Sequence, residues 1–181
     1  MIPQSYITAW RKNVPWKEDY QVEQDLIIHR AIIDLFSDDF IKDRLAFCGG
    51  TALHKLFLFP SARYSEGIDL VRLKSEPISP IIECIREKLS FLEKPRVIQK
   101  EHKNTISYRI QSEDGVPLRL KIEVNTIDCF SIYNLQNILV KLSSEWYKGE
   151  ALIPTYGLNE LLATKLRALY QRSKGRDLFD L

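Results

Sequence analysis

A pair of adjacent glycines constrains this chain more than any other feature of its sequence. Gly49-Gly50-Thr51 follows the short apolar run Leu45–Cys48, which predicts a buried strand, and precedes a helical pattern that continues to about Leu58. Glycine lets the backbone approach a ligand closely, and the free N–H groups at the start of the following helix favour phosphate. We expect Thr51 to cap that helix and to add a hydroxyl hydrogen bond. Alone the turn is a weak signal, because many strand-to-helix turns carry two glycines.

Two acidic residues stand inside apolar strand patterns further along the chain. Asp69 lies in the pattern over 68–73, and Glu123 lies in the pattern over 118–125. A carboxylate on a buried strand is costly unless it is paired or binds a metal ion. If the two strands are neighbours, the carboxylates converge on phosphates bound at the glycine turn, and hard oxygen ligands of this kind suit Mg²⁺. The structural alternative pairs Asp69 with Arg63 or Arg72, and Glu123 with Arg109 or Lys121.

The last quarter of the chain is rich in basic residues. Lys165 and Arg172 are seven residues apart in a strong helical pattern that covers Leu158–Tyr170, so they share a helix face. Cations on that face could hold a triphosphate and neutralise the charge that grows in phosphoryl transfer. The alternative is a solvated basic face, with Arg176 and Asp177 only fixing the last short helix. The other cations of this region are Arg167 and Lys174.

The remaining pattern mixes helices with strands, as an α/β fold does. Helical spacing predicts amphipathic helices over Gln21–Phe36 and Pro80–Phe91. Alternation predicts strands over Arg96–Lys100, Thr105–Gln111 and Leu118–Asn125, the last two joined in a hairpin, and further edge strands over Ile138–Leu142 and Leu152–Thr155. We expect an N-terminal arm over 1–20, a core over 21–157 and a helical segment over 158–181, which ends within an apolar helical pattern as a shortened chain would.

Composition excludes several classes of protein. The 181 residues are 45% hydrophobic and 28% charged, as in soluble globular domains. No apolar run approaches the roughly 20 residues of a membrane span, and the N-terminus lacks a signal-peptide pattern. A net charge of +2 is too small to imply a nucleic-acid partner by itself. Cys48, Cys84 and Cys129 are odd in number and far apart, so we expect buried thiols in a reducing cytoplasm.

Four segments in this order resemble the AbiEii/AbiGii-type nucleotidyltransferase toxins of bacterial toxin–antitoxin systems, which are associated with abortive phage infection. The segments are FCGGTALHKLF, RYSEGIDLVRL, LKIEVNT and ELLATKLRALYQRSKGRDLFDL, all within residues 21–181. The resemblance implies a polymerase-beta-like nucleotidyltransferase fold, with a mixed sheet flanked by helices and a C-terminal helical segment. It also implies an NTP and Mg²⁺ as ligands, an RNA acceptor such as tRNA, and a cognate antitoxin as partner.

The resemblance assigns roles to single residues as well. The turn matches the family's GG[ST] motif, the two strand acids match its second and third metal-binding acids, and the lysine of the long helix matches one that contacts nucleotide. The implied nucleotide-binding set is Gly49, Gly50, Thr51, Lys165, Arg176 and Asp177; the metal-binding set is Asp69 and Glu123; the catalytic set is Asp69, Glu123 and Lys165.

One position departs from the family pattern. Members read S-E-D-I-D-L where this chain reads S-E-G-I-D-L, so Gly67 takes the place of the first metal-binding aspartate. Losing that carboxylate should weaken metal binding and slow catalysis by orders of magnitude. Three explanations are open: an inactivating substitution that lets a toxic protein be produced, which we favour; a natural degenerate copy; or Glu66 turning inward through a bulge. The alternative functions are a catalytically degenerate module that binds nucleotide or a partner, and a kinase-like phosphotransferase.

Overall fold

The computed structural model describes residues 2–58, 60–126, 131–173 and 175–181, and its strands form one mixed sheet in the order β3-β4-β5-β2-β1-β7-β6. The pairs β2–β5 and β1–β7 are parallel, and the other neighbours are antiparallel. The strands are β1 (Leu45–Cys48), β2 (Gly67–Arg72), β3 (Arg96–Lys100), β4 (Lys103–Gln111), β5 (Pro117–Asn125), β6 (Gln136–Ser143) and β7 (Lys148–Thr155). The sheet confirms the expected mixed α/β class.

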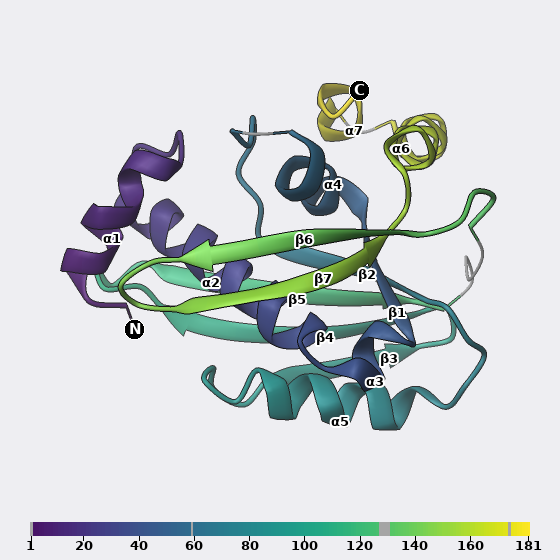
Figure 1. Ribbon diagram of the computed structural model, residues 1–181, viewed down its shortest axis with the longest axis horizontal. Helices are drawn as coiled ribbons and strands as arrows, with labels where there is room; N and C mark the ends of the chain where they lie inside the picture. The colour runs from purple at the N-terminus through teal and green to yellow at the C-terminus, as the bar shows by residue number, and fades with distance from the viewer. Residues whose placement is uncertain (1, 59, 127–130, 174) are drawn as a thin grey trace.

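Helices cover both sides of this sheet. In Figure 1, α4, α6 and α7 lie above the sheet, and α5 lies below it. The helices are α1 (Gln4–Trp10), α2 (Asp19–Phe36), α3 (Asp39–Lys42), α4 (Gly49–Ala52), α5 (Ile78–Lys88), α6 (Leu158–Arg172) and α7 (Gly175–Phe179), with a 3₁₀ turn η1 (Arg11–Asn13) and a π-helical turn η2 (Leu53–Phe57) that continues α4. None of the helices in the described ranges is long and apolar enough to cross a membrane.

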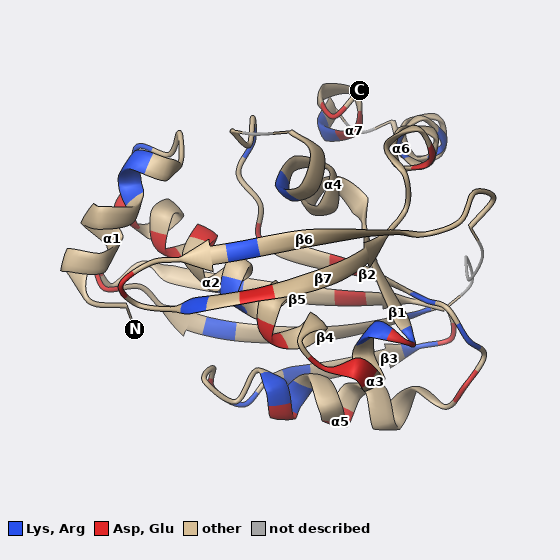
Figure 2. Ribbon diagram, in the orientation of Figure 1, with Lys and Arg blue, Asp and Glu red and all other residues tan. Residues whose placement is uncertain are grey.

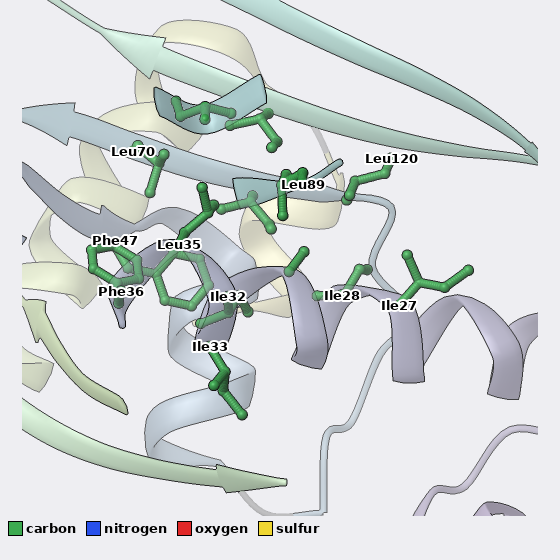
Figure 3. Packing of buried hydrophobic residues seen from close by; sticks show 14 of the residues in the cluster. Ile27, Ile28, Ile32, Ile33, Leu35, Phe36, Phe47, Leu70, Leu89 and Leu120 are labelled. Carbon is green, nitrogen blue, oxygen red and sulfur yellow. The ribbon is translucent and has the colours of Figure 1, made fainter. Parts of the chain in front are cut away.

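The main core lies between the sheet and the apolar faces of α2 and α5. Strand side chains alternate between the two faces, so Phe47 of β1 and Leu70 of β2 both point into this core. Phe36 of α2 packs on Phe47 with ring centroids 6.5 Å apart, and Figure 3 shows the two rings side by side. Burying each such side chain contributes about 1.5–3 kcal/mol. The same alternation places Asp69 and Glu123 on the other face, beneath α4 and α6.

The N-terminal arm packs on this core. Residues 4–10 form α1, and Ile2 and Ile7 are fully buried in the main apolar cluster. The sequence predicted an arm here but assigned no helix within it. Its burial comes from contacts with α2 rather than from local sequence.

Two sequence expectations about the sheet and its turn are wrong. The helix after β1 begins at Gly49, so Thr51 does not cap it; Thr51 lies inside the helix and its hydroxyl donates to the Gly67 carbonyl at 2.7 Å. Leu152–Thr155 belongs to β7, which lies between β1 and β6 and is therefore no edge strand. The apolar pattern of a short strand does not reveal whether a second neighbour pairs with it.

The cysteines differ from expectation in degree of burial. Cys48 and Cys84 are half-buried rather than fully buried. Cys129 lies outside the described residues, as does Lys174 among the C-terminal cations.

Candidate active site

Asp69 and Glu123 lie opposite each other on the parallel strands β2 and β5. Opposed residues point to the same face of a sheet, so the two carboxylates converge as the strand patterns suggested. Burial raises the pKa of Asp69, and the neighbouring charge of Glu123 raises it further. The nearby cations Lys165, Lys103 and Arg176 act in the opposite direction but do not cancel the shift.

Two lysines hold the Glu123 carboxylate. Lys103 Nζ of β4 lies 2.5 Å from Glu123 Oε2, and Lys121 Nζ of β5 contacts Oε1. Burial alone would raise the pKa of Glu123, but hydrogen bonds from the two lysines hold it below its usual value. The Glu123–Lys121 pair considered as a structural alternative is therefore present, together with a lysine that local sequence did not indicate.

The arginines considered as partners of Asp69 are engaged elsewhere. Arg63 pairs with Asp180, with Nε 2.6 Å from Oδ1. Arg72 donates from Nη1 to the Glu76 carbonyl at 2.5 Å. The Asp69 carboxylate thus faces the glycine turn with its charge balanced only at longer range.

Neighbouring side chains come so close to the turn that neither Gly49 nor Gly50 leaves room for a Cβ. Gly49 has a φ of +76°, and a Cβ there would stand 2.9 Å from the Cβ of Asp69 and nearer still to its Oδ2. A Cβ on Gly50 would collide with the Arg63 guanidinium and stand 3.1 Å from Lys165 Nζ. The Asp180 carboxylate also approaches that position, at 2.7 Å, so the turn places bare backbone between Asp69 on one side and the Arg63–Asp180–Lys165 network on the other.

Lys165 is buried in an ion-pair network beside Gly50. Its Nζ lies 2.8 Å from Asp180 Oδ2 and 3.4 Å from Asp177 Oδ1. The Asp180 side chain is fully buried and is also contacted by Arg63 and His54, whose Nε2 lies 3.0 Å from Oδ1. Burial alone would raise the pKa of Asp180, but these partners hold it well below its usual value. Lys165 thus reaches the turn only as part of a network centred on Asp180.

The two residues of the final motif have different surroundings. Asp177 is buried and pairs with Lys165 and with Arg172, whose Nη2 lies 3.3 Å from Asp177 Oδ2. Arg176 is exposed, and its charge acts on Asp69. Figure 2 shows both signs of charge on α6 and α7. Asp177 therefore matches the structural alternative, whereas the positive charge of Arg176 lowers the pKa of Asp69.

The donors on this face suit a divalent ion that is completed by phosphate. Within the described ranges, no group of three or more His, Cys, Asp or Glu side chains forms a ready metal site. Asp69 and Glu123 nevertheless share one face, and Mg²⁺ is commonly held by one or two carboxylates together with substrate phosphates and water. The set fits such an ion only in company with a bound nucleotide.

Comparison with known protein families shows to which family this chain belongs. Residues 30–181 match the family described as the nucleotidyl transferase AbiEii toxin of type IV toxin–antitoxin systems. The chain belongs to the AbiEii family. AbiEii membership agrees with the order of strand, glycine turn, acidic strand and C-terminal helices seen here. Nucleotidyltransferases of this kind generally use a divalent metal ion.

Two solved structures share the fold of this AbiEii chain. MenT4, a nucleotidyltransferase toxin from Mycobacterium tuberculosis H37Rv, matches with a TM-score of 0.61 and 17% identity over 99% of this chain. An antigenic nucleotidyltransferase-like protein from Paracoccidioides brasiliensis matches with a TM-score of 0.51 and 16% identity, over 84% of this chain and 72% of that one. The chain spans 63% of the length of MenT4. No curated protein matches.

The structure also bears on Gly67 and on its neighbour Glu66. β2 pairs with β5 in continuous register from Gly67 to Val71. Glu66 precedes the strand and is exposed, and its carbonyl accepts from the Lys121 N–H at 3.1 Å. That register contains no bulge that would turn Glu66 inward, so Glu66 does not join Asp69 and Glu123 on the site face.

Proposed function

We propose that this chain is a nucleotidyltransferase toxin that transfers NMP from an NTP to an RNA acceptor, with tRNA as the first acceptor to test. It would act in the cytoplasm, opposed by a cognate antitoxin. Gly67, in place of the first aspartate, would lower its activity. The observation that carries this proposal is the opposition of Asp69 and Glu123 on one sheet face, with Asp69 against the glycine turn.

The chemistry follows from the arrangement around the turn. Phosphates of the NTP would approach the backbone N–H groups of Gly49 and Gly50, which carry no side chains of their own, beside the Arg63 guanidinium. Lys165 would add positive charge by leaving Asp177, the longer of its two contacts at 3.4 Å. Asp69 and Glu123 would hold Mg²⁺, which when bound polarises the phosphorus and lowers the pKa of the acceptor hydroxyl.

Transfer itself is a single displacement. The acceptor hydroxyl oxygen bonds to the α-phosphorus, the bond from that phosphorus to the bridging oxygen breaks, and pyrophosphate leaves. Asp69, whose pKa is raised by burial and which lies against the glycine turn, would take the hydroxyl proton.

A catalytically degenerate nucleotide-binding module is the second candidate. The observation that favours it is that both Glu123 oxygens are already in contact with lysines. A divalent ion would have to displace those ammonium groups, and no second aspartate is present at position 67 to help.

Labelled transfer distinguishes the two functions. The protein, Asp69→Asn and Glu123→Gln would each be incubated with tRNA, Mg²⁺ and one labelled NTP at a time, and the RNA would be separated on a gel. We expect slow labelling by the unaltered chain with at least one nucleotide, and none by either variant. Release of pyrophosphate rather than a nucleoside diphosphate would separate transfer of NMP from kinase-like chemistry.

Restoring the aspartate is the sharpest single change. A Cβ at Gly67 would stand 2.9 Å from the Lys121 carbonyl oxygen, so Gly67→Asp requires β2 and β5 to shift slightly. We expect faster labelling together with a lower thermal midpoint. Absence of labelling and of growth inhibition by both proteins, with all four nucleotides, would count against the transferase and leave the binding module.

A further inference from the structure

Lys103 and Lys121 form a pair of accessible cations on the site face. They come from neighbouring strands, β4 and β5, and each contacts a different oxygen of Glu123. The Lys103 side chain is 47% exposed and the Lys121 side chain 39% exposed, so each ammonium can reach a ligand from solvent. An ammonium group has three N–H donors, so each lysine can donate to a phosphate oxygen while it keeps its contact with Glu123, whose side chain is only 17% exposed.

Lys121 stands beside the position where the family aspartate is missing. Gly67 and Lys121 are opposed across β2 and β5, two pairs before Asp69 and Glu123, so all four positions lie on one face. Gly67 brings no side chain to that face, and a Cβ there would stand 2.9 Å from the Lys121 carbonyl oxygen. A cationic side chain thus stands next to the place where an anionic one is expected.

Glycine in place of aspartate at position 67 changes the net charge that a nucleotide meets on this face. Asp69 and Glu123 carry two negative charges, and Lys103 and Lys121 carry two positive ones. A third carboxylate at position 67 would make this group net negative and would repel a triphosphate unless metal ions intervened. With Gly67 the group is balanced, and Lys165 and Arg176 add positive charge around Asp69.

We propose that Lys103 and Lys121 bind the triphosphate of the nucleotide directly, so that this chain takes up nucleotide without a divalent metal ion. The proposal rests on the proposed function only in assuming that a nucleoside triphosphate is the ligand. Lysine ammonium groups are common phosphate ligands in proteins. The metal ion is then required for transfer, not for binding.

The test is a binding measurement in the absence of metal. Calorimetry would use inorganic tripolyphosphate and each of the four NTPs, first in EDTA and then in Mg²⁺. We expect binding in EDTA within about tenfold of that in Mg²⁺, and a loss of about tenfold in EDTA for Lys103→Met and for Lys121→Met. Lys121→Arg should restore binding, because it retains the positive charge.

A matched control is available on β6, at the opposite edge of the sheet. Lys141 pairs with Glu150 at 2.7 Å across β6 and β7, is 63% exposed, and is separated from β5 by three strands. Lys141→Met should leave binding unchanged. Binding that appears only with Mg²⁺, no binding in EDTA at all, or equal losses for Lys121→Met and Lys141→Met would each overturn the proposal.

The outcome is independent of whether transfer occurs. A protein that binds tripolyphosphate in EDTA but never labels RNA would defeat the transferase function alone. A protein that labels RNA with Mg²⁺ yet binds no triphosphate in EDTA would defeat the lysine proposal alone.

Discussion

Asp69 of β2 packs directly against Gly49, the first residue after β1: a Cβ at residue 49 would stand 2.9 Å from the Asp69 Cβ. Cys48, which precedes the turn, is opposed to Asp69 in the antiparallel pairing of the two strands. The backbone of the turn and the carboxylate are therefore fixed relative to each other by strand pairing. A side chain at position 49 would have to push either the turn or the acid away.

Gly49→Ala should accordingly impair both stability and binding. Gly49 has a φ of +76°, and a left-handed conformation costs an L-residue about 1–2 kcal/mol before the collision with Asp69 is counted. Gly115→Ala is the matched control, since Gly115 has a φ of +75° but only Gln111 within reach, at 3.9 Å. Urea denaturation should show the larger loss for Gly49→Ala, and only that variant should lose triphosphate affinity. Equal losses of stability in Gly49→Ala and Gly115→Ala would show that the contact between residue 49 and Asp69 adds no cost beyond that of the backbone conformation.

Because Asp69 ionises, the stability of the fold should fall as the pH rises, whereas transfer activity should increase. Burial and the charge of Glu123 raise its pKa above 3.8 in the folded protein. The folded state therefore retains a proton that the unfolded state has lost, and ionising Asp69 removes stability as the pH rises through the folded pKa. Asp69→Asn should be more stable than the unaltered chain near pH 7 and similar near pH 4, by denaturation at a series of pH values.

Transfer should change in the other direction over the same range. Only ionised Asp69 can accept a proton or bind Mg²⁺, so labelling of RNA should rise with pH across the raised pKa. Asp69→Asn should show no labelling at any pH. A stability difference that is constant with pH would contradict the raised pKa.

Asp180→Asn should destabilise the protein more than any other change in the C-terminal segment. The Asp180 side chain is fully buried among Lys165, Arg63 and His54, and removing one partner from a buried ionic group costs about 3–5 kcal/mol. Its folded pKa is lowered, so its contribution is present above pH 3.8 and is lost as the pH falls towards the folded pKa.

The measurement is denaturation at neutral pH and near pH 3, with an exposed acid as control. Asp114 is exposed in the β4–β5 turn, so Asp114→Asn should change stability by less than about 0.5 kcal/mol. The penalty for Asp180→Asn should shrink at the lower pH. A small penalty at neutral pH would mean that the network around Lys165 is held by other contacts.

Local sequence was enough to predict the parts of the site that lie on single strands and turns. The apolar run Leu45–Cys48 before two glycines is β1, and the alternation around Asp69 and Glu123 predicted their strands; the shared face was expected only if those strands were neighbours, and the β2–β5 pairing makes them so. Each of these signals is contained within about ten residues. The alternation of apolar and polar residues did not predict the order of the strands in the sheet.

Contacts between distant segments could not be read in this way. Lys103 reaches Glu123 because β4 pairs with β5, and no spacing in the sequence indicates that register. Asp180 could have been noticed, because it follows Asp177 by three residues and therefore shares its helix face. Its partner Arg63 lies 117 residues earlier, so the network itself depends on the tertiary fold.

The N-terminal segment offers a further prediction, because its two tryptophans bind one buried carboxylate. Trp10 and Trp16 each donate from Nε1 to Asp25 at 3.3 Å, and Asp25 also contacts Lys55 and His29. Lys55 lies in η2, directly after the glycine-turn helix, and its side chain is only 6% exposed. Asp25→Ala would leave that ammonium buried without its counter-charge, which costs about 3–5 kcal/mol.

The tryptophans report on this cluster directly. With Asp25→Ala we expect a loss of stability of that size by urea denaturation, and a red-shifted tryptophan emission as the indoles lose their acceptor and gain water. Lys42→Met is the control, because Lys42 pairs at 2.6 Å with an Asp39 side chain that is 90% exposed, and such pairs contribute about 0–1 kcal/mol. Since Lys55 follows the turn, triphosphate affinity should fall with Asp25→Ala and not with Lys42→Met. Unchanged emission and affinity in Asp25→Ala would show that contacts other than Asp25, such as the burial of Ile2 and Ile7, hold the N-terminal segment.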